Sequence, residues 1–69
     1  MKDIQELDSV VLLKDYPERG LFMGDVGCVL IQHDEKHYEI EFPDEQGQTR
    51  QTLALPADDI LRLNLKVAG

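Results

Sequence analysis

Apolar and charged residues alternate strictly through one segment of the chain: His37, Tyr38, Glu39, Ile40, Glu41 and Phe42. Side chains of a β-strand point alternately to its two faces, so a two-residue period indicates a strand that is buried on one side. The sequence therefore predicts a strand over residues 37–42 with an apolar inner face and a charged outer face.

Four further segments have the length and the β-branched, apolar composition of strands. They are Ser9–Leu13, Val26–Gln32, Thr49–Leu55 and a last one over residues 61–67. In the last segment leucine and valine alternate with polar residues, which predicts one clean apolar face. Gly27 interrupts the second segment, and a glycine inside a strand is typical of a bulge or of a close backbone approach.

The connections between these strands narrow the fold class. A long first loop contains Pro17, Gly20 and Gly24, which are the residues that chain reversals need. Pro56 opens a single helical turn before the last strand. Only six residues separate the third and fourth strands, too few for the helix that an OB-fold places there. We therefore expect an all-β domain, a small five-stranded SH3-like barrel with a long first loop and a one-turn helix before the last strand.

Several stretches of the chain together resemble a small bacterial protein family of unknown function. Members of this family share an aspartate followed by an apolar run, and then the motifs Pro-Glu-x-Gly-Leu, Gly-x-x-Gly-x-Val and Leu-Pro-x-Asp. In this chain the corresponding stretches are Asp8–Leu13, Pro17–Leu21, Gly24–Val29 and Leu55–Asp58. The resemblance spans about residues 8–63 and implies an SH3-like barrel and a bacterial source, but no activity. The Gly24–Val29 stretch is more weakly similar to KOW domains and to the SH3-like barrel of the nitrile hydratase beta subunit.

The charge balance excludes classes of partner. Fourteen acidic residues against seven basic ones give a formal charge of −7 over 69 residues. Nucleic acids and anionic membranes are bound by clustered Lys and Arg, so neither is an expected partner.

The length fits one domain, residues 1–69 with a core over about 8–67. The single cysteine, Cys28, forms no internal disulfide, which favours a reducing cytoplasm.

Four of the fourteen acidic residues gather at one strand and the turn after it: Glu39, Glu41, Asp44 and Glu45. Carboxylates at alternating outward positions predict exposure, and an ordinary solvated face is the simplest interpretation. The functional alternative is a docking surface for a basic protein, because complementary charge raises association rate and selectivity.

Other chemistry-bearing residues are sparse. His33 and His37 flank a turn with acidic residues between them, and imidazole and carboxylate are ligands for zinc or nickel. Two histidines beside a polar turn are more often solvated.

Cys28 has no recognisable base near it, so packing in the barrel wall is the expectation. Leu21 and Phe22 are expected to pack the first loop onto the barrel. We predict no enzyme activity and no cofactor.

The sequence thus favours a non-catalytic interaction module, a monomer or weak homodimer, that binds a bacterial partner protein through its acidic face. Neutralisation of a basic toxin, as by an antitoxin or immunity protein, fits a small acidic cytoplasmic protein. The alternative is an accessory or chaperone protein of a metalloenzyme such as nitrile hydratase, suggested by the weaker similarity alone.

Overall fold

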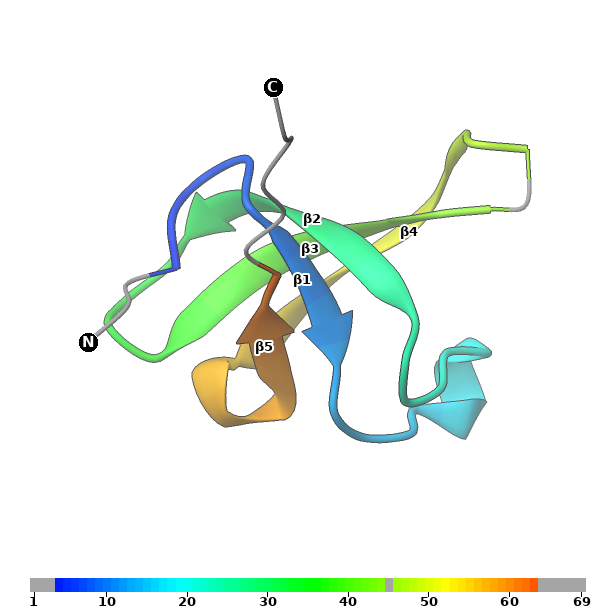
Figure 1. The fold of residues 1–69 in the computed structure, drawn as a ribbon, viewed down its shortest axis with the longest axis horizontal. Helices are drawn as coiled ribbons and strands as arrows, with labels where there is room; N and C mark the ends of the chain where they lie inside the picture. The colour runs from blue at the N-terminus through cyan, green and yellow to red at the C-terminus, as the bar shows by residue number, and fades with distance from the viewer. Residues whose placement is uncertain (1–3, 45, 64–69) are drawn as a thin grey trace, which may run out of the picture.

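Five antiparallel strands form one sheet in the computed structural model, which describes residues 4–44 and 46–63, the side chains of residues 49 and 50 excepted (Figure 1). In chain order the elements are β1 (Ser9–Leu12), η1 (Pro17–Arg19), β2 (Val26–Gln32), β3 (His37–Pro43), β4 (Thr49–Pro56), η2 (Ala57–Asp59) and β5 (Ile60–Arg62). The sheet order is β4-β3-β2-β1-β5. The predicted all-β class, with its long first loop and one-turn helix before the last strand, is confirmed. The described residues include no helix of the length and apolarity that a membrane span requires.

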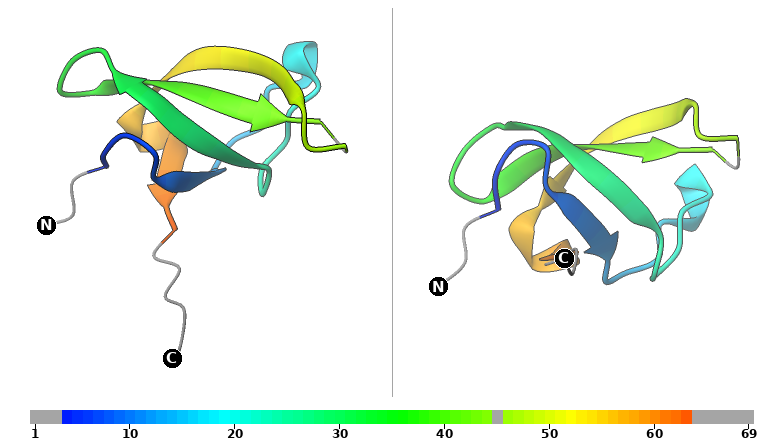
Figure 2. Two further views of the ribbon diagram at one scale, coloured as in Figure 1. Left: turned by 90° about the horizontal axis from the view of Figure 1, so that it is seen from above. Right: turned by 45° about the horizontal axis from the view of Figure 1, so that its top comes forward.

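The sheet curls around a single apolar core. Figure 2 shows β3 and β4 on one side and β1 and β5 on the other, with β2 running between them. Every strand contributes buried apolar side chains, and the first loop adds one more. The buried set is Val10, Leu12, Leu21, Val29, Tyr38, Ile40, Phe42, Leu53, Leu55 and Ile60. Curling lets so short a chain enclose a core from both sides.

Gly27 lies where β2 passes very close to β3. A Cβ atom built at this position would stand 2.7 Å from the Ile40 Cγ2 atom, 2.8 Å from the Glu41 carbonyl oxygen and 2.9 Å from the Phe42 Cδ1 atom. The predicted close approach is therefore confirmed. The bulge lies further along, between Val29 and Ile31, where the register with β3 shifts by one residue.

The first loop closes back on itself through the Tyr16–Leu21 bridge around η1. Pro17 begins this turn, and Gly20 ends it in the left-handed conformation at φ 71°. Leu21 is buried in the core as expected, but the prediction for Phe22 is wrong, because this residue is 49% exposed. The backbone amide of Phe22 donates to Asp25 Oδ2 at 2.9 Å, which fixes a turn directly after Leu21.

The last strand presents a different residue to the core from the one that its leucine pattern indicates. Ile60 is buried opposite Leu12, whereas Leu61 pairs with the outward residue Val11 and is 55% exposed. Because η2 ends at Asp59, Ile60 is the first residue to meet β1, and this sets which face turns inward. Residues 64–67 of the predicted strand lie outside the described part of the chain.

Candidate functional site

The outer face of β3 carries two of the four predicted carboxylates. Tyr38, Ile40 and Phe42 point into the core, so Glu39 and Glu41 share the opposite face, as the alternation predicts. The register sets Glu39 between Ile31 and Ala54. It sets Glu41 between Cys28 and Thr52, the cysteine being half-buried on this outer face rather than in the core. The two carboxylates therefore stand among small and aliphatic neighbours.

Glu39 already has a partner within the domain. Its Oε1 atom lies 2.8 Å from Nε2 of His33 in the segment after β2. The hydrogen bond from His33, and next the one from the Thr52 hydroxyl, lower the pKa of Glu39. The carboxylate consequently stays ionised over a wider pH range, and an incoming cation must share it with His33.

Asp44 organises the β3–β4 turn. Its Oδ1 atom accepts hydrogen bonds from the backbone amides of Gln46 and Gln48, both at 2.9 Å. An aspartate that bonds amides two and four residues ahead stabilises a chain reversal, which is a structural role. Glu45, the fourth predicted residue, lies outside the described residues.

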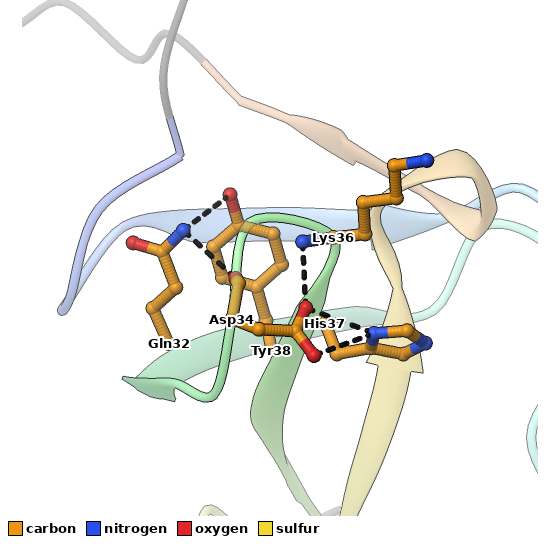
Figure 3. A network of polar contacts seen from close by, with 5 residues as sticks. All are labelled: Gln32, Asp34, Lys36, His37 and Tyr38. Carbon is orange, nitrogen blue, oxygen red and sulfur yellow. Dashed lines mark hydrogen bonds and ion pairs between the residues drawn. The ribbon is translucent and has the colours of Figure 1, made fainter.

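The two histidines do not converge on a common point. His33 pairs with Glu39, whereas Nδ1 of His37 lies 3.0 Å from Asp34 Oδ1 (Figure 3). The Lys36 backbone amide, and then His37, lower the pKa of Asp34. Across residues 4–44 and 46–63, no group of three or more metal-ligating side chains is placed to hold an ion. The β2–β3 turn is thus a set of local pairs.

A comparison of the sequence with protein-family models identifies the family of the chain. The family described as "Domain of unknown function (DUF4926)" matches residues 6–62, from just before β1 to the end of β5. The chain belongs to the DUF4926 family. Searches of curated proteins and of solved structures find no match. The predicted membership of an uncharacterised family is confirmed, and the matched region of the DUF4926 domain contains every residue of the candidate site.

The DUF4926 domain also contains a buried carboxylate that the sequence does not single out. Asp59 in η2 is only 5% exposed, and its Oδ2 atom accepts a hydrogen bond from the Tyr16 hydroxyl. Its Oδ1 atom lies 3.1 Å from the Lys14 Nζ atom, and its backbone oxygen accepts from the Leu13 amide at 2.8 Å. These contacts fasten the start of the first loop to η2. The partners are 43 residues apart, so no local pattern reveals them.

The Tyr16–Asp59 contact makes folding sensitive to pH at both extremes. Burial, followed by Asp59, raises the pKa of Tyr16 to about 12. The Tyr16 hydroxyl, and then Lys14, lower the pKa of Asp59 against the opposing effect of burial. An unfolded tyrosine ionises near pH 10 and an unfolded aspartate near pH 3.9. The stabilisation from Tyr16 is therefore complete below about pH 10 and lost toward pH 12. The stabilisation from Asp59 is complete above about pH 4, and it is lost as the pH falls through the pKa of Asp59 in the folded protein, which lies below the unfolded value.

We expect Tyr16→Phe to lower the free energy of unfolding by about 1.5–3 kcal/mol at pH 7, the usual contribution of a hydrogen bond to a charged group. The variant should also lose less stability than the wild type between pH 10 and pH 12. Urea titrations at pH 7, 10 and 11.5 measure both effects. Tyr38→Phe is the matched control, since it leaves the Tyr16–Asp59 contact intact and should keep the alkaline loss. An unchanged alkaline loss in Tyr16→Phe would contradict the assignment.

Proposed function

We propose that this DUF4926 domain is a non-catalytic protein-interaction module that binds a basic partner through the outer face of β3. The observation that supports this most is the position of Glu39 and Glu41 on one sheet face, two residues apart on a single strand. Strand geometry fixes their spacing, so the two charges form a preorganised pair rather than a chance cluster on a loop.

The charge of the whole domain acts in the same direction. Two of its cations are already paired internally, Lys14 with Asp59 at 3.1 Å and Arg62 with Asp8 at 3.0 Å. The formal charge of −7 therefore attracts a basic protein at long range, while the β3 pair supplies a local contact. Such complementarity contributes chiefly to association rate and partner selection.

In its specific form, the proposal is that the partner is a basic bacterial protein that the domain neutralises, in the manner of an antitoxin or immunity protein. The excess of acid over base supports this form. A partner neutralised in this way need not be chemically altered, and the carboxylates act only by binding.

We expect the double substitution Glu39→Lys and Glu41→Lys to weaken partner capture at least about tenfold, since like charges brought together cost several kcal/mol. The matched control is Glu18→Lys with Asp58→Lys, which changes the net charge equally at two exposed residues outside this face. Each immobilised protein is exposed to lysate of the native host, the retained proteins are identified by mass spectrometry, and the leading one is then titrated.

The outcomes separate a local surface from a general effect of charge. Loss in the β3 variant with retention in the control supports the proposal, provided that circular dichroism shows both variants folded. Equal retention of the partner by both variants would exclude the β3 face, and an acidic retained partner would exclude the electrostatic basis.

A further inference from the structure

Three aliphatic residues form a straight row across the outer face of the other half of the sheet. Val11 in β1 pairs with Leu61 in β5 on one side and with Val26 in β2 on the other. Leu61 is 55% exposed and Val26 is 49% exposed, with Val11 partly buried between them. Neighbouring strands lie about 4.8 Å apart, so the three side chains are contiguous. We call Leu61, Val11 and Val26 the aliphatic row.

Carboxylates stand beside the aliphatic row on the same face. Cys28 is the next outward residue of β2 after Val26, and it pairs with Glu41 of β3. Cys28 therefore lies between Val26 of the aliphatic row and Glu41 of the proposed β3 face. The two features form one surface that is apolar on one part and acidic on the other.

At Val26 the aliphatic row also meets a hollow of about 410 Å³ between the first loop and the β3–β4 turn. Phe22, half-exposed, lines it together with Asp25 and Asp44. One oxygen of each aspartate accepts backbone hydrogen bonds within its own turn, which holds the carboxylate in place. An exposed aromatic ring that shares a hollow with two fixed carboxylates suits a Lys or Arg side chain, through cation–π attraction and ion pairing.

These features identify the kind of partner that fits. A second copy of the domain would bring another −7 charge against the same surface, so self-association is disfavoured. We propose that the surface binds an amphipathic basic segment of the partner. Apolar side chains of that segment cover the aliphatic row, and one of its cationic side chains enters the hollow beside Phe22. This inference rests on the proposed function and extends its surface from β3 to β5.

The test uses a defined probe, a fluorescein-labelled 14-residue helical peptide of leucine and lysine with leucine on one face. Anisotropy titration gives its dissociation constant for the folded domain and variants. We expect Leu61→Ser and Phe22→Ser each to weaken binding about tenfold, the loss typical of removing one well-buried apolar contact. Leu7→Ser is the matched control, because Leu7 is 79% exposed and lies outside the row; it should leave affinity unchanged.

The outcomes distinguish this inference from the proposed function. Absence of peptide binding to the wild type, equal binding of a leucine–glutamate peptide, or unchanged affinity in Leu61→Ser and Phe22→Ser would overturn the amphipathic surface. If Leu61→Ser and Phe22→Ser leave the peptide affinity unchanged while Glu39→Lys with Glu41→Lys abolishes binding, the β3 face is supported as the binding surface and the aliphatic row is excluded from it. If the two serine variants weaken binding and the charge reversal does not, the aliphatic row is supported as a binding surface and the β3 proposal is contradicted.

Discussion

Truncation of Leu12 to alanine is expected to lower the free energy of unfolding by about 2–5 kcal/mol. Leu12 has no exposed surface and lies opposite Ile60, where β1 pairs with β5. Removal of its isobutyl group costs the transfer free energy of the lost atoms and leaves a cavity that the surrounding strands fill only in part. Urea denaturation followed by circular dichroism measures the change.

The neighbouring leucine provides the control. Leu13 follows Leu12 directly but is 40% exposed, so Leu13→Ala should cost less than about 1 kcal/mol. The pair isolates burial from residue type and from position along the chain. Equal losses at the two leucines, or a loss below about 1 kcal/mol at Leu12, would contradict the inward orientation of this residue in β1.

The sequence predicts elements well where one face is buried and poorly where orientation depends on a neighbour. The alternation at β3 identified both faces correctly, because charge marks the outer one. At β5 the alternation of leucine with polar residues indicates the face that begins with Leu61 as the inner one, because the polar Arg62 follows Ile60 on the other face. Pairing with β1 makes the choice, and it leaves Leu61 exposed.

The same limit applies to the charges. Composition counts fourteen acidic residues, but it does not show how many are used within the fold. The side chains of several aspartates accept hydrogen bonds from backbone amides in turns or at the base of the first loop: Asp8, Asp15, Asp25, Asp34 and Asp44. A small sheet with many tight turns needs such acceptors. Part of the acidity therefore serves the fold, and Glu39 and Glu41 are distinguished by lying on a strand instead.

For a related reason, the sequence predicts the acidic part of the candidate surface but not its aliphatic part. Period-two alternation identifies residues on one strand, so Glu39 and Glu41 could be found. The aliphatic row joins residues from three strands that are far apart in the chain, and its existence depends on two registers. The contact of His33 with Glu39 likewise depends on the bulge after Val29, which a glycine at position 27 suggested only approximately.

Substitution of Gly27 by alanine is expected to cost about 3 kcal/mol, at the upper end of the range for overpacking. The added methyl group would lie within 3 Å of three atoms, one of which is the Glu41 carbonyl oxygen in the backbone of β3. A backbone atom in a paired strand cannot rotate away as a side chain can, so the β2–β3 pairing itself must shift. The free energy of unfolding from urea titration measures the cost.

Gly24→Ala is the matched control, because the two glycines are required for different reasons. At Gly24 an added Cβ atom meets nothing within 4 Å, but φ is 98°, so alanine there is strained without being crowded. That strain is worth about 1–2 kcal/mol, since L-residues disfavour positive φ. We therefore expect the greater loss at Gly27, accompanied by faster amide hydrogen exchange in β2 and β3. A loss at Gly27 smaller than at Gly24 would contradict the close approach, and with it the tight curl that brings β2 from one half of the sheet to the other.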